Sequence, residues 1–166
     1  MSAEETLYDD PVLRLVRSRN LLLAAWSNAP AVGHAHALGR GLALLAREYL
    51  ADFGVLNVVV GGTPRFADDF RAALNKIVAD PKLQGHGAAH VILLEGLAGV
   101  ATRAFLSTVF LVGRSVAPNK VFADLPRASA WLAPLMARGR EPWSPDDVTR
   151  AARAFLEAAP LTTRRP

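Results

Sequence analysis

Two glycines, a threonine and a proline follow the most strongly strand-like run of the chain. Residues Val55–Val60 are rich in β-branched side chains and predict a buried strand, and Gly61–Pro64 comes directly after it. Pro64 suits the first helical turn and Thr63 suits the position that caps a helix. Ligand and regulatory chemistry in α/β proteins sits at such strand-to-helix turns, so a functional site is expected here.

Thr63 has two interpretations. Its hydroxyl can accept a phosphate, which makes Thr63 a candidate regulatory phosphosite. Alternatively the hydroxyl caps the following helix and contributes about 1 kcal/mol to its stability. The Gly61-Gly62 turn lacks the Lys-Ser/Thr pair of a phosphate-binding loop, so we predict no nucleotide and no other cofactor.

Histidine, serine and carboxylate residues are present, but their spacing favours neither metal binding nor catalysis. His34 and His36 point to different faces of a helix, and His86 and His90 flank the entry to a strand. His90 also fits a hydrogen-bonded core histidine. The sequence contains no Gly-x-Ser-x-Gly elbow, and so we predict no catalytic and no metal-binding residues. An enzyme would need convergent polar side chains and a shifted pKa near Glu95, Asp124 or the Gly61-Gly62 turn.

Composition narrows the classes of partner. The 166 residues are 51% hydrophobic and 20% charged, which suggests that some apolar surface meets a partner. The net charge is +4, but the basic residues are scattered, so nucleic-acid binding is not expected. The apolar stretch from Leu97 to Val112 is too short for membrane insertion. The chain has no Cys and an acidic start unlike a signal peptide, which predicts a cytoplasmic protein.

Apolar strands alternate with helices along most of the chain. We expect a hairpin from Val12–Arg17 and Leu21–Trp26, helices over 31–53, 64–79 and 97–114, strands over 88–95 and 120–124, and a helix that begins near Leu125. A further helix is predicted to begin after the cap signal at Ser144 and to end near Ala159.

This order predicts an α/β fold with a mixed, mostly parallel sheet of about five strands, an N-terminal antiparallel hairpin and flanking helices. Residues 1–10 are expected to be a lead-in and residues 11–138 the α/β domain. Residues 139–160 are expected to form an appended C-terminal helix, and residues 161–166 a tail.

The helix expected over 97–114 is apolar on nearly every side and must be covered. Two interpretations stay open. The C-terminal helix covers it, or it forms an interaction surface for a protein partner or for a second copy in a homodimer. The candidate surface residues are Phe105, Val109, Phe110 and Val112.

A short strand at Lys120–Asp124 runs directly into the helical sequence Leu125–Leu132, which contains Ala-Trp-Leu. Together with the order of elements over roughly residues 8 to 138, this unit resembles the STAS-like group that includes the bacterial anti-sigma-factor antagonists. The resemblance implies a STAS-like signalling domain that binds a protein partner and is sometimes phosphorylated after a central strand. Thr63 falls at about that place, although the Asp-Ser-Ser-Gly-like signature of the regulated members is missing.

The leading hypothesis is therefore a non-enzymatic regulatory or scaffolding protein that acts through protein–protein interaction in bacterial signalling. The alternative is a small-molecule or lipid-binding module, which an enclosed apolar cavity of several hundred Å³ would favour. An enzyme with an unrecognised site ranks third.

Overall fold

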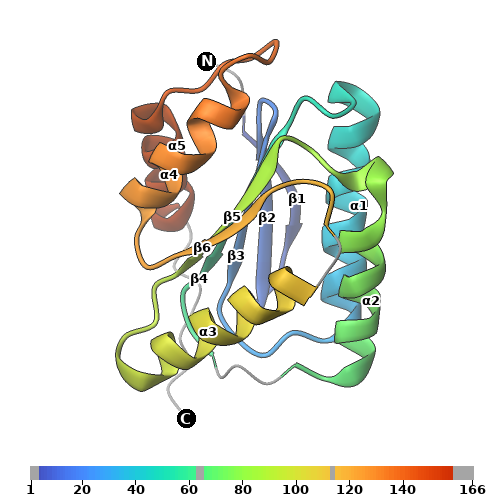
Figure 1. The fold of residues 1–166 in the computed structure, drawn as a ribbon, viewed down its shortest axis with the longest axis vertical. Helices are drawn as coiled ribbons and strands as arrows, with labels where there is room; N and C mark the ends of the chain where they lie inside the picture. Colours follow the sequence, from blue (N-terminus) through green and yellow to red (C-terminus); the bar gives the residue numbers. More distant parts are fainter. Residues whose placement is uncertain (1–3, 63–65, 113–114, 159–166) are drawn as a thin grey trace.

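The computed structural model describes residues 4–62, 66–112 and 115–158, without the side chains of residues 105 and 108–112. One six-stranded sheet lies at the centre, with helices α1 and α2 on one face and α4 and α5 on the other (Figure 1). The elements are β1 (Glu5–Asp9), β2 (Leu13–Ser18), β3 (Leu21–Trp26), α1 (Val32–Tyr49), β4 (Gly54–Val59), α2 (Asp68–Ala79), the 3-10 turn η1 (Pro81–Leu83), β5 (Gly87–Ile92), α3 (Gly96–Val112), β6 (Asn119–Phe122), α4 (Leu125–Met136) and α5 (Pro145–Glu157).

The strands follow one another in chain order across the sheet. Strands β1, β2 and β3 form an antiparallel meander, and β3 to β6 run parallel, connected by α1, α2 and α3. The predicted α/β class, the opening hairpin and the mostly parallel sheet are confirmed.

The sheet has six strands instead of about five because residues 5–9, expected to be part of a lead-in, form the edge strand β1. This strand was not predicted because Glu5 and Asp9 interrupt its apolar pattern. Glu5 lies opposite Arg17 in the ladder, and their side chains form an ion pair at 2.8 Å. An edge strand needs only one partner, so an ion pair and a few half-buried side chains suffice to hold it.

Alternate residues of the parallel strands face two different cores. Leu23, Leu56 and Val91 face α4 and α5 and belong to one hydrophobic cluster with residues of these helices. Leu22, Ala24 and Val55 face α1 and α2.

Helix α5 is part of the first core, which differs from its expected place as an appendage. Val148, Ala152 and Phe155 are buried in one cluster with residues of the sheet and of α4. The connection before α5 is anchored as well, because the indole N–H of Trp143 donates a hydrogen bond of 2.8 Å to the buried Asn20 side chain in the β2–β3 turn. Residues 145–157 therefore pack on the face of the sheet opposite α1 and α2.

Helix α2 begins at Asp68, four residues later than expected, with Ala67 at its N-cap. The two acidic residues of its first turn, Asp68 and Asp69, explain this start because carboxylates stabilise the positive end of the helix dipole. Thr63 is therefore not the cap of α2, and it lies outside the described residues. None of the helices in the described ranges is long and apolar enough to cross a membrane.

Candidate functional site

A cavity of about 250 Å³ lies under α2, between α1, α3 and the α2-side face of the sheet. Strands β3, β4, β5 and β6 provide its floor, and most of its described lining is apolar or aromatic. The main contributors are Trp26, Leu38, Leu42, Val55, Val59, Phe66, Phe70, Leu74, Ile77, Val78, Leu83, Leu94 and Leu106. The exposed lining residues Asn28, Gly62, Arg71 and Asn75 mark its mouth. The cavity is thus an apolar space with a polar entrance.

A row of three polar side chains crosses the cavity floor from strand to strand. Asn57 of β4 lies directly opposite His90 of β5, and its side-chain N–H contacts His90 Nδ1 at 3.3 Å. On the other side, His90 Nε2 lies 3.1 Å from Oδ1 of Asn119 in β6. All three residues line the cavity. The face that α2 and α3 cover therefore carries a row of polar side chains in the middle of an apolar lining.

The row continues at both ends. The indole N–H of Trp26 points to Asn57 Oδ1 at 3.4 Å. At the far end, Asn119 donates to Ser115 Oγ at 2.8 Å, and the Ser115 hydroxyl donates to Gln84 Oε1 at 3.0 Å. All the donors in this series of hydrogen bonds point in the same direction, so each hydrogen bond polarises the group that makes the next one. The polar groups thus satisfy one another inside an otherwise apolar cavity.

His90 is neutral in this arrangement. Its Nδ1 accepts a hydrogen bond from Asn57 and its Nε2 must carry the proton that Asn119 Oδ1 accepts. Burial lowers the pKa of His90 to about 4, although the hydrogen bond with Asn119 acts in the opposite direction. An imidazole with so low a pKa is a weak base at neutral pH, and both of its nitrogens are already bonded. The row meets the criterion of convergent polar groups with a shifted pKa, yet it favours recognition over proton transfer.

The Gly61-Gly62 turn lies at the cavity mouth, where the sequence predicted a site. Gly62 has φ +94°, and a Cβ at this position would lie 2.8 Å from the backbone of Asn28. Only glycine tolerates both the left-handed backbone and this close approach. The turn therefore brings the chain after β4 against the segment after β3 and closes one side of the mouth.

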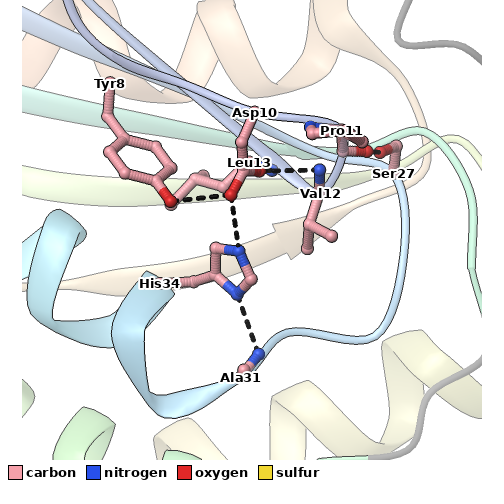
Figure 2. Close-up of polar contacts among 8 residues, drawn as sticks. All are labelled: Tyr8, Asp10, Pro11, Val12, Leu13, Ser27, Ala31 and His34. Atoms are coloured by element: carbon pink, nitrogen blue, oxygen red, sulfur yellow. Dashed lines mark hydrogen bonds and ion pairs between the residues drawn. The ribbon is translucent and has the colours of Figure 1, made fainter.

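A second polar cluster joins the β1–β2 turn to the start of α1 (Figure 2). The Asp10 carboxylate accepts hydrogen bonds from the Tyr8 hydroxyl at 2.6 Å and from His34 Nε2 at 2.9 Å, and its other oxygen accepts the backbone N–H of Val12 and Leu13. Burial alone would raise the pKa of Asp10, but these hydrogen bonds outweigh it and lower the pKa to about 2.

This cluster is not a catalytic triad. Nδ1 of His34 accepts the backbone N–H of Ala31 at 2.8 Å, so neither ring nitrogen is available to a nucleophile. The nearby Ser27 hydroxyl donates to the Pro11 carbonyl instead of to His34. The arrangement caps α1 and fixes the first hairpin against it.

The other candidate residues do not gather at one site. His86 pairs with Asp52 at 2.8 Å, and Asp124 caps α4 by accepting the N–H of Arg127. Glu95 is exposed after β5. Within the part of the chain that the structure describes, no three His, Cys, Asp or Glu side chains are grouped to hold a metal ion.

The predicted interaction surface is on α3. The side chains of Phe105, Val109, Phe110 and Val112 lie outside the described residues, as does Thr63. Apolar side chains near the start of α3 are described and are exposed, with Leu97 89% and Val100 57% accessible.

His90 is a buried, hydrogen-bonded histidine, as one interpretation of the sequence predicted. The row of polar side chains that contains it was not predicted. The signal was present: Asn57 and His90 each interrupt a run of apolar residues at the fourth position of a strand that begins with glycine. Buried parallel strands are normally apolar throughout, so two matched interruptions indicate a shared polar feature.

Searches of protein-family models, of curated proteins and of solved structures found no match to this chain. The functional assignment therefore depends on the chemistry of the cavity.

Proposed function

We propose that this protein is a non-catalytic module that binds a small, mostly apolar molecule in the cavity between α2, α3 and the sheet. The observation that carries the proposal is a 250 Å³ apolar cavity whose floor holds a fully paired, neutral polar row. Apolar walls supply the binding free energy, and a few fixed polar groups supply orientation, as in most small-molecule sites.

The size of the cavity limits the ligand. A dry cavity of about 150 Å³ accommodates benzene, so 250 Å³ corresponds to roughly ten non-hydrogen atoms. A ligand of that size that binds mainly through apolar contacts is expected to have a dissociation constant on the order of 0.1–1 mM. Probe molecules with eight to ten heavy atoms, such as 1-octanol, match this space.

Filling the cavity should abolish binding. Ala88 lines the floor beside Val55, so Ala88→Leu places a larger side chain in the cavity. We expect 1-octanol affinity to fall by about tenfold or more and the free energy of unfolding to rise by about 0.5–2 kcal/mol, as for other cavity-filling substitutions. Isothermal titration calorimetry and urea denaturation measure the two effects.

The matched control is Ala154→Leu, which adds the same side chain at an exposed position of α5 on the other side of the sheet. It should leave 1-octanol affinity unchanged. A wild-type protein that shows no saturable binding of 1-octanol or of similar small apolar probes would contradict the proposal.

The second candidate function is that of a STAS-like regulatory or scaffolding domain that acts by protein–protein interaction. It is favoured by the exposed Leu97 and Val100 near the start of α3. Replacing both by Glu should convert an oligomer into a monomer in light scattering without loss of helical signal in circular dichroism. A wild-type protein that is monomeric at every concentration, with no change in the double variant, would count against self-association.

A further inference from the structure

The charge around the cavity identifies a class of ligand. Among the described residues that line the cavity, Arg71 is the only one with a charged side chain, and none is acidic. Arg71 is exposed and lies on α2 at the mouth, one turn before Asn75 on the same helix face. The interior is neutral, because His90 is neutral at physiological pH.

We propose that the cavity binds an anionic amphiphile: a molecule whose apolar part of about eight carbons occupies the space between α2 and the sheet and whose carboxylate lies at Arg71. This inference rests on the proposed function, since it names the ligand class of the same cavity. The guanidinium group of arginine holds carboxylates through paired N–H donors, and exposed Asn28 and Asn75 add amide donors at the same mouth.

The interior of the cavity would bind the apolar part of the ligand, and its mouth would bind the anionic group. The apolar chain displaces water from Leu38, Leu42 and Val55, and the anionic group stays in water near the exposed guanidinium, so no charge has to be buried. A cationic amphiphile would place its charge beside Arg71 and would be repelled. A neutral one would gain the apolar contacts alone.

Two carboxylates are close to Arg71 in the sequence, and neither lines the cavity. Asp68 lies one turn before Arg71 on α2 and is exposed, and it does not line the cavity. Asp69 accepts the backbone N–H of Phe70 at 2.7 Å. Arg71 therefore lines the mouth of the cavity, whereas neither of these acidic side chains does.

Three eight-carbon probes that differ only in their terminal group test the proposal: octanoate, 1-octanol and octylamine. Each is titrated calorimetrically into the full-length protein. Wild type should bind octanoate more tightly than octylamine. Arg71→Gln should weaken octanoate about tenfold and leave 1-octanol unchanged, whereas Arg71→Lys should restore part of the loss. The control Arg153→Gln, which removes the same charge from an exposed position of α5, should change neither affinity.

The outcomes separate this inference from the proposed function. If 1-octanol binds and Ala88→Leu blocks it, but Arg71→Gln leaves octanoate affinity unchanged, the cavity is a binding site and the anionic ligand is ruled out. Tighter binding of octylamine than of octanoate would overturn the inference in the same way. If none of the three probes binds, the proposed function fails and this inference fails with it.

Discussion

Lowering the pH from 6.5 to 4 is expected to reduce the free energy of unfolding by about 3 kcal/mol through His90 alone. Burial between Asn57 and Asn119 lowers the pKa of His90 from 6.5 to about 4 in the folded protein. Between these two values the unfolded chain binds a proton that the folded protein does not, so stability falls as the pH falls. Above pH 6.5 the contribution of His90 is fully present.

Urea denaturation at a series of pH values from 7.5 to 3 measures this loss. His90→Gln keeps a polar side chain but cannot titrate, so the part of the slope that lies between pH 6.5 and 4 should disappear. Asp10 provides an internal reference, because its folded pKa of about 2 makes its contribution fall only below pH 3.8. An equal slope in wild type and His90→Gln would show that His90 is not buried in its neutral form.

Protonation of His90 is also expected to weaken ligand binding in the cavity. Protonation of His90 Nδ1 removes the acceptor for the Asn57 amide and places a charge on the floor. A buried charge is costly, so protonation of His90 favours opening of the segments that cover the cavity floor. Ligand affinity should therefore follow the same pH window as stability, which links the neutral row to the proposed binding function.

The sequence predicted the fold class because periodicity is a local property. Apolar runs at Leu21–Trp26 and Val55–Val60 form strands, and the spacing of Phe70, Leu74 and Ile77 predicts α2. Strand β1 was missed because its acidic residues conceal a pattern that depends on Arg17 in the next strand. The row was missed because it becomes visible only when β4 and β5 are aligned in register.

The sequence placed a candidate site at the turn after β4, and the structure places a cavity beside this turn. The Gly61-Gly62 turn does line the mouth of the cavity, as strand-to-helix turns in α/β sheets often do. The phosphate acceptor predicted in the turn, Thr63, lies outside the described residues. The cavity is formed by side chains of α1, α2, α3 and four strands, which no short motif contains.

The packing of the last helix, α5, also could not be predicted from local sequence. The spacing of Val148, Ala152 and Phe155 predicted an amphipathic helix, but could not indicate which surface it covers. Contacts between residues far apart in the sequence determine which surface α5 covers. The Arg14 guanidinium of β2 lies 5.4 Å from the centre of the Phe155 ring, and it also donates to the Phe155 carbonyl at 3.3 Å.

Because Phe155 is buried in the core under α4 and α5, Phe155→Ala is expected to destabilise the protein by about 3–5 kcal/mol. The substitution removes apolar contacts with the sheet and leaves a cavity, and it also takes away the aromatic face beneath Arg14. Glu157→Ala, at an exposed position of the same helix, should change stability by less than about 0.5 kcal/mol. Urea denaturation of the two variants compares an appended helix with an integral one.

A loss near 1 kcal/mol for Phe155→Ala would mean that α5 packs loosely and that the α/β domain is complete without it. The stronger form of the comparison is a chain cut to residues 11–138, which removes the ladder of β1 together with Trp143 and α5. We expect this fragment not to fold cooperatively, since Leu21, Leu23 and the buried face of α4 would lose their cover. A cooperative transition with wild-type midpoint would instead restore the appendage interpretation.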